Sequence, residues 1–394
     1  MSSSRRLAPA LIGSGLVLGV AGLLAYLADP WFWERLVTFP TADAVTAVEW
    51  YRPLEAVAGA TRNEVHTATP ERQSVARTAI AQAVAYGTQT KSVALLVWHQ
   101  GALELEQYWP GYGPDSRTES GAMHATVLAL LYGIAIDQGI IRSPEEPAAT
   151  YLPEWRQDAR ARIRIRDLLQ MASGLEIVAP SRNPWNRALR LFLGGNSTAL
   201  ALDSLPVAEP ATRFEYSEFD AEILGIILQR ASGKRYARFL AQQLWTPLGA
   251  GPAGVWLDHG NGMARTFCGL QATARGWLEV GLLILNEGRS DTGQIVPAAW
   301  IKQMLTPSSA NRNFGLQIWL GNALGGEREY NSATRVRVRQ SEPFLAPDVV
   351  YLDDGGGQRV YIIPSQQLVI VRTGARRTDW DDARLPNAIL RGVS

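Results

Sequence analysis

The chain has 394 residues, of which 46% are hydrophobic and 19% charged, so it is long enough for one large domain or several small ones. This composition is that of a globular protein and excludes wholesale disorder, a collagen-like repeat and a disulfide scaffold. Lys and Arg (38) nearly balance Asp and Glu (37), so no basic excess supports nucleic-acid binding. The single cysteine, Cys268, permits no internal disulfide and is expected to be buried.

Residues 7–28 contain no charge, and 22 residues are enough for a helix to cross a bilayer core of about 30 Å. Arg5 and Arg6 precede this run and Trp31-Phe32-Trp33 follow it. That order predicts an N-terminal membrane anchor with the main domain on the outer or periplasmic face. A cleaved secretory signal is the alternative, but a cut after Ala28 would put Tyr26 where a small residue is preferred.

The rest of the chain divides into a spacer, residues 29–68, and one main domain, residues 69–394. Thr69-Pro70 predicts the start of a helix that ends near Gly87. Apolar runs and alternation predict strands at 92–99, 102–108, 359–363 and 367–372. Helical periodicity predicts helices at 122–138, 165–172, 220–231, 272–285 and 380–390. Between them, residues 176–213 are predicted to be a long irregular loop of the kind that forms a lid or binding wall.

Strands at both ends of the domain and helices between them predict an α/β (α+β) fold. An antiparallel sheet is built from N- and C-terminal strands, about 69–112 and 305–394, and is flanked by helices. A mostly helical subdomain, about 113–304, is inserted in it.

Six segments, in the right order over about residues 75–375, resemble the serine hydrolases of the class C β-lactamase and D,D-peptidase family, which includes penicillin-binding proteins. The segments are 122–126 (AMHAT), 167–175 (DLLQMASGL), 213–217 (RFEYS), 245–249 (WTPLG), 271–275 (QATAR) and 355–358 (GGGQ). The resemblance implies a β-lactamase/transpeptidase-like fold and hydrolysis of ester or amide bonds through an acyl-enzyme. The related branch includes esterases and amide hydrolases such as 6-aminohexanoate-dimer hydrolase.

In that family the first segment opens with Ser-x-x-Lys, which puts a nucleophile and its base one helical turn apart. Counting back from Gly133, the family's helix glycine, places Ala122 at the serine position and Ala125 at the lysine position. A methyl group neither attacks a carbonyl nor exchanges a proton, so the chain is predicted to be inactive as written. Ser120 is expected to cap the helix, and a substitute Ser120–His124 pair is disfavoured.

The resemblance assigns roles to further residues. Tyr216 matches the tyrosine that passes a proton to the leaving group, and Glu218 stands where the family has asparagine, which argues against a true β-lactamase. Gly356, Gly357 and Gln358 match the strand that lines the site, and the N–H of Gln358 would complete the oxyanion hole with that of Ala122.

Trp185, in the long loop, is a candidate for lining the substrate pocket. Neither a metal nor a cofactor is expected. Asp353 and Asp354 are adjacent and should point apart on a strand. The expected partners are a small-molecule or peptide ligand and the membrane; nucleic acid is not expected, and protein partners cannot be assigned.

Two hypotheses explain the paired alanines. The first is an engineered knock-out of an active hydrolase, favoured because the flanking helix, Tyr216 and the glycine segment show no drift. The second is a natural pseudoenzyme that binds a peptide, an acyl ligand or a protein without turnover.

Overall fold

The computed structural model describes residues 22, 24–42, 44–60, 65–69, 71–322, 325–334 and 337–393. Most of the predicted anchor, residues 7–28, lies outside these ranges. Within them, none of the helices combines the length and apolar character that crossing a membrane requires. The anchor therefore stays a prediction from the sequence.

The main sheet is antiparallel, has six strands and joins both ends of the domain, which confirms the predicted fold class. The N-terminal hairpin lies beside the C-terminal strands in the order β3 (Ala102–Tyr108), β2 (Ser92–His99), β14 (Leu368–Gly374), β13 (Arg359–Ile363), β12 (Val350–Asp353) and β9 (Trp319–Leu320). Strand β2 is almost wholly buried, as expected of a continuous apolar run covered on both faces.

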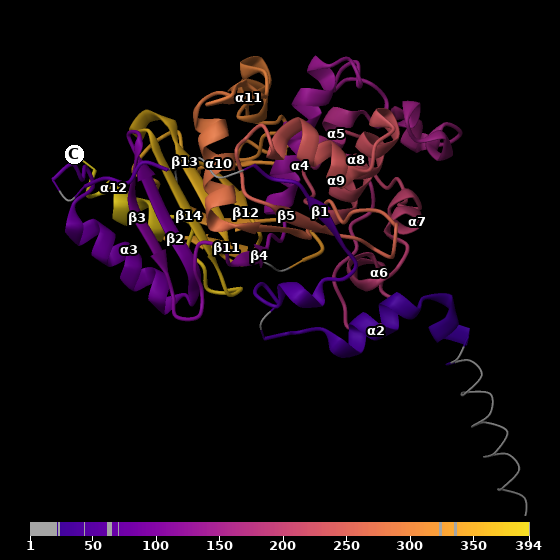
Figure 1. Cartoon of the computed structure of the whole chain (residues 1–394). Coiled ribbons are helices and arrows are strands. Elements are labelled where there is room, and N and C mark those ends of the chain that lie inside the picture. Colours follow the sequence, from indigo (N-terminus) through magenta and orange to yellow (C-terminus); the bar gives the residue numbers. More distant parts are fainter. Residues whose placement is uncertain are drawn as a thin grey trace, which may run out of the picture.

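Helices cover both faces of this sheet (Figure 1). α3 (Arg77–Gln89) and α12 (Arg384–Leu390) pack together on one face, and α10 (Ala274–Leu285) lies against β13 and β14 on the other. The helix predicted from Thr69 begins only at Arg77, because Val75 pairs with Val393 as an isolated bridge. It continues through Gly87, where an added Cβ would lie 2.5 Å from the Trp109 ring.

The helical part is built around α4 (Met123–Asp137), which is apolar on every side and almost completely buried. Gly133 allows the close approach of a neighbouring helix, since its Cβ would lie 2.2 Å from Cδ1 of Trp300. Around it stand α5 (Ile165–Leu169), α8 (Glu218–Ser232), α9 (Tyr236–Leu240), η5 (Ala241–Trp245) and α11 (Ala298–Met304). The domain also contains the 3-10 turns η2 (Ala148–Thr150), η3 (Pro153–Trp155), η4 (Ala159–Arg162) and η6 (Pro364–Gln366).

The stretch 176–213, predicted to be irregular, contains two short helices, α6 (Arg187–Leu193) and α7 (Ser197–Leu202). Asparagines cap both: the side chain of Asn186 accepts from Leu189 N, and that of Asn196 from Ala199 N. Helices of two turns or fewer leave too little periodicity to be read from sequence.

Residues 29–68, predicted to be a spacer, supply regular structure where they are described. They form α2 (Pro30–Thr38), η1 (Val48–Trp50) and β1 (Leu54–Val57), and β1 joins a second sheet of order β1, β5 (Ala253–Trp256), β6 (Leu270–Thr273) and β4 (Arg117–Glu119). Two small hairpins complete the strands: β7 (Arg289–Ser290) with β8 (Gly293–Gln294), and β10 (Gly326–Glu329) with β11 (Arg337–Gln340).

Arg35 attaches α2 to the domain. Its guanidinium is 4% exposed and donates to the carbonyl oxygens of Arg52, Leu193, Gly194, Leu257 and Asp258 at 2.8–3.3 Å. It also lies 5.0 Å from the Trp31 and Trp256 ring centroids. The segment after the predicted anchor is therefore fixed to the body of the protein.

Candidate functional site

A cavity of about 790 Å³ lies where α4 begins. Its walls come from parts of the chain that are distant in sequence: the segment that follows α2, both ends of the β2–β3 hairpin, the turn into α4, the region of α6, the start of α8, the loop before β6, and the loops after β12 and β14. The lining includes Phe39, Tyr51, Lys91, Trp109, Glu119, Ala122, Leu189, Phe192, Glu218, Phe267, Asp354 and Arg376. Aromatic and apolar side chains thus surround a few charged groups, the usual make-up of a ligand site.

Ala122 lies at the lining of this cavity, at the N-cap position of α4. The turn before it is tight: Gly121 has φ +51°, and its Cβ would lie 2.7 Å from Cβ of Asp354. Ala125, one turn later, is 2% exposed and packs in the core. The methyl of Ala122 therefore stands where the resemblance places a nucleophile, and no ionisable side chain stands at position 125.

Ser120 and His124 do not replace the missing pair. The prediction that Ser120 caps α4 is wrong, because its Oγ donates to Gly121 O and accepts from Leu270 N. His124 is fully buried, with Nδ1 2.5 Å from Cys268 O and Nε2 2.8 Å from the Tyr236 hydroxyl. Burial lowers the pKa of His124 to about 4, so the ring is neutral at pH 7. Cys268 is buried as predicted.

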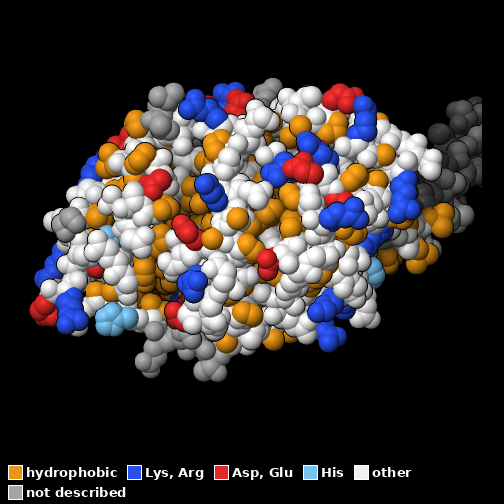
Figure 2. Space-filling view, turned by 90° about the horizontal axis from the view of Figure 1, so that it is seen from above, with side chains coloured by type: hydrophobic (Ala, Val, Ile, Leu, Met, Phe, Trp, Pro, Cys, Tyr) orange, Lys and Arg blue, Asp and Glu red, His pale blue; other side chains and the backbone are white. Residues whose placement is uncertain are grey.

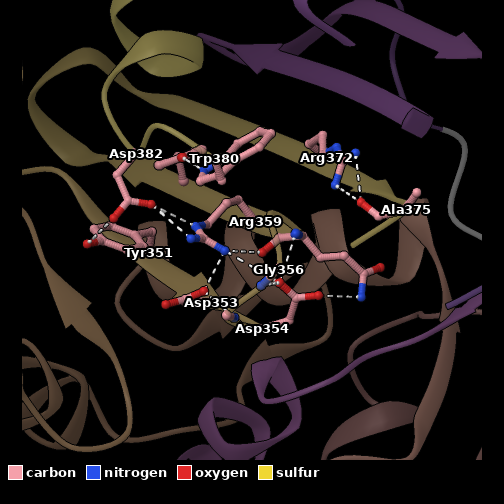
Figure 3. A network of polar contacts seen from close by, with 12 residues as sticks. Tyr351, Asp353, Asp354, Gly356, Arg359, Arg372, Ala375, Trp380 and Asp382 are labelled. Atoms are coloured by element: carbon pink, nitrogen blue, oxygen red, sulfur yellow. Dashed lines mark hydrogen bonds and ion pairs between the residues drawn. The ribbon is translucent and has the colours of Figure 1, made fainter. Parts of the chain in front are cut away.

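The glycine segment after β12 is held by the side chain of Asp354. Asp354 Oδ1 accepts from Gly356 N at 2.7 Å and from Gln358 N at 2.9 Å, and Oδ2 accepts from Gln358 Nε2 at 3.0 Å (Figure 3). Gln358 Nε2 also donates to Glu119 O. The N–H that the resemblance assigns to an oxyanion hole is therefore bonded within the protein, and its role toward a ligand stays a prediction.

A buried ion network holds this loop from behind. Arg359 pairs with Asp353 at 2.5 Å and with Asp382 at 2.9 Å (Figure 3). Arg328 pairs with the same two carboxylates. Burial opposes ionisation of Asp353, but Arg328 and Arg359 outweigh it and hold the pKa of Asp353 below its usual value. The network joins β10, β12, β13 and the loop after β14.

Tyr216 lies beside the site, outside the set of residues that line the cavity. Its ring stacks on Trp319 with centroids 6.1 Å apart and meets Tyr330 edge-on at 5.5 Å. Burial, followed by the charge of Glu218, raises the pKa of Tyr216 well above its usual value. The hydroxyl is therefore protonated at every ordinary pH.

Two other predicted residues are covered by side chains from the loop after β14. An added Cβ on Gly356 would lie 2.4 Å from Arg376 Cγ, and one on Gly357, which has φ +101°, would lie 2.8 Å from the Trp380 ring.

Trp185 is 64% exposed and touches Trp33 and Arg190. It is not one of the residues that line the cavity.

Two carboxyls of the cavity have raised pKa values. Burial, opposed by N–H donation from Gly269 and Gly121, raises the pKa of Glu119 to about 7. Glu218 is exposed to the cavity, and desolvation by the surrounding protein raises its pKa, while the Arg376 guanidinium lowers it. A binding site that contains both Glu218 and Arg376 offers an acceptor and a cation to a polar ligand.

The sequence did not predict Glu119, Asp354 and Arg376 as site residues. Asp354 adjoins the glycine segment, which is a usable local signal, whereas Arg376 has none. The wall formed by residues 39–51 was also missed, although the aromatic residues Phe39, Trp50 and Tyr51 are unusual for a spacer.

Similarity to known proteins extends along nearly the whole domain. A family model described as Beta-lactamase matches residues 76–393. The 6-aminohexanoate-dimer hydrolase of Paenarthrobacter ureafaciens is 26% identical over 233 residues, which are 56% of this chain and 59% of that protein, so the match spans less than two thirds of the relative.

Solved structures share the fold at low sequence identity. A Bacillus anthracis protein called a 6-aminohexanoate-dimer hydrolase superposes with a TM-score of 0.71 at 17% identity, covering 91% of this chain and 94% of that one. A family VIII carboxylesterase gives 0.60 at 16% identity (82% and 98% covered), and a class C β-lactamase from Rhodobacter sphaeroides gives 0.55 at 18% (79% and 97%).

Proposed function

Because this chain belongs to the Beta-lactamase family of hydrolases, we propose that it is a membrane-anchored member that binds a small-molecule or peptide ligand in its cavity without forming an acyl-enzyme. The observation that carries the proposal is the methyl group of Ala122 at the cavity lining, where a nucleophilic oxygen would be required. In a serine hydrolase of another fold, loss of the nucleophile alone costs about a million-fold in turnover.

The loop at Asp354 supports the natural pseudoenzyme over an engineered knock-out. Replacing two side chains on α4 would leave the rest of the machinery in its working arrangement. Instead, the Asp354 carboxylate occupies the N–H groups of Gly356 and Gln358. Glu218 replaces the family's asparagine as well. Three separate parts of the site thus depart from acyl-transfer chemistry.

Ligand binding is supported by what the cavity retains. Its volume suits a ligand of drug or short-peptide size, and its charged groups lie among aromatic rings. The relatives named above are, by their names, an amide hydrolase, a carboxylesterase and a β-lactamase. We therefore propose an amide- or ester-containing ligand.

Anchoring in the membrane and location outside it are supported by the uncharged run of residues 7–28 and by Arg5 and Arg6 before it. Extraction of vesicles with alkaline carbonate tests the anchor: retention in the pellet is expected. In cells that have an outer membrane, added protease should reach the main domain only after that membrane is made permeable.

The lack of acylation is tested by intact-mass spectrometry of the full chain in detergent after exposure to a fluorophosphonate. We expect no adduct on the natural sequence, and an adduct there would overturn the proposal. The double variant Ala122→Ser, Ala125→Lys is the comparison. It should also stay unlabelled, because Asp354 still holds the N–H of Gln358; labelling of the double variant would favour the knock-out hypothesis instead.

A further inference from the structure

Large apolar side chains are exposed mainly at one end of the described molecule. Five of the nine such side chains among the described residues belong to the region of α2: Leu24 (62% exposed), Tyr26 (49%), Leu27 (60%), Val37 (80%) and Trp185 (64%). Exposed apolar side chains that cluster in one patch indicate an interaction surface, because a surface in contact with water alone rarely carries such a patch.

These side chains belong to one connected surface. Trp33 Nε1 donates to Ala25 O at 2.9 Å, which ties the segment before α2 to α2 itself. The Trp33 ring meets Trp185 edge-on at 6.3 Å. Val37 follows Trp33 by four residues and therefore lies on the same side of the helix. We call the surface made by Leu24, Tyr26, Leu27, Val37 and Trp185 the α2 face.

The α2 face borders the cavity. The chain passes from α2 directly into Phe39 and Thr41, which line it. Farther along the chain, Trp185 lies between Ser181 and Ala188, which both line the cavity. Figure 1 shows α2 and α6 side by side, far from α12. Arg35 holds α2 in this position, so the face and the cavity move as one body.

We propose that the α2 face rests in the interfacial layer of a lipid bilayer, so that the cavity opens at the level of the lipid headgroups. This rests on the proposed membrane anchor. The occupant is indicated by the chain itself: the 22 uncharged residues end at Ala28, directly after Leu27 of the α2 face, and α2 begins two residues later. Trp and Tyr beside aliphatic side chains are the composition that a membrane interface favours.

The test uses the full chain reconstituted in vesicles of phosphatidylcholine and phosphatidylglycerol. A polarity-sensitive thiol-reactive fluorophore is attached to Val37→Cys or Trp185→Cys. Leu345→Cys is the matched control, because Leu345 is also exposed and apolar (53%), and its N–H donates to Asn387 of α12, at the other end of the molecule. Cys268 lines the cavity and is the one native thiol of the sequence, so all three variants are made in a Cys268→Ala background.

We expect labels at positions 37 and 185 to be quenched by nitroxide lipids and shielded from iodide by at least about twofold relative to position 345. Equal iodide quenching at all three positions, with the protein still retained after carbonate extraction, would overturn the inference and leave the anchor standing. Release by carbonate would overturn both. The fluorophosphonate result is independent of either outcome, so failure of the non-acylating assignment is recognised separately.

Discussion

The carboxyl of Asp220 lies fully buried near the start of α8, where Ser173 Oγ donates to it at 2.8 Å. Burial raises the pKa of Asp220 to about 8. Burial also raises the pKa of Glu222, two residues later, to about 7. The native state therefore binds protons more tightly than the unfolded chain does. Stability contributed by these groups is present at low pH and falls as the pH rises from the unfolded pKa, about 4, to the folded value.

Asp220→Asn is expected to flatten this dependence, because the asparagine has no proton to lose. Between pH 5 and pH 8 the Tm of the natural protein should fall relative to that of the variant by about 2 °C or more. Differential scanning fluorimetry at several pH values measures it. Asp137→Asn, an exposed aspartate at the end of α4, is the control and should run parallel to the natural protein. Parallel curves for Asp220→Asn would contradict the assignment.

Whole elements show where sequence patterns are sufficient. The predicted strands 92–99, 102–108 and 359–363 are found with the same bounds, because long apolar or alternating runs report directly on burial. Ala122 lies at the cavity lining, but its assignment to the nucleophile position, made from a motif and a helix glycine, stays a prediction. Asp354, Arg376 and the wall at 39–51 were not predicted, because their place in the site depends on contacts between distant segments. Local sequence patterns do not predict such contacts.

The docking of α2 depends on Arg35, which donates to five carbonyl oxygens. Two of them also accept from other side chains: Gly194 O from Arg265 and Arg52 O from Trp256. Arg35→Met should cost on the order of 3 kcal/mol, because buried acceptors lose their donors while the stem volume is kept. Hydrogen exchange of residues 39–51 should rise at the same time. Exposed Arg182→Met is the matched control and should change neither quantity. Unchanged exchange at 39–51 would show that α2 is held by other contacts.

At the scale of the molecule, the ion network of Figure 3 connects the sheet with the last loop of the chain. Asp382 accepts from Arg359 and Arg328 while it is 1% exposed. Asp382→Asn leaves two buried guanidinium groups with less opposing charge, so unfolding in urea should require about 3–5 kcal/mol less. Asp379→Asn breaks an exposed pair with Arg377 and should change the midpoint little. Similar midpoints for both variants would argue against the network.

Charges on the outer surface are arranged differently from those in the network. On the face drawn in Figure 2, basic and acidic side chains are interspersed, and neither sign dominates. With a net charge of +1, long-range electrostatic attraction contributes little to finding a ligand. Recognition of the proposed ligand would then depend on contacts made inside the cavity.

The contacts of Arg35 also limit how far the cavity can move from the proposed anchor. A flexible tether of 40 residues would allow excursions of roughly 35 Å from its attachment point. With residues 7–28 as the proposed anchor, fixing α2 to the domain removes that radius and holds the cavity beside the anchor. Under that proposal the cavity stays at the membrane surface, and a ligand held at the same surface would reach it by lateral diffusion.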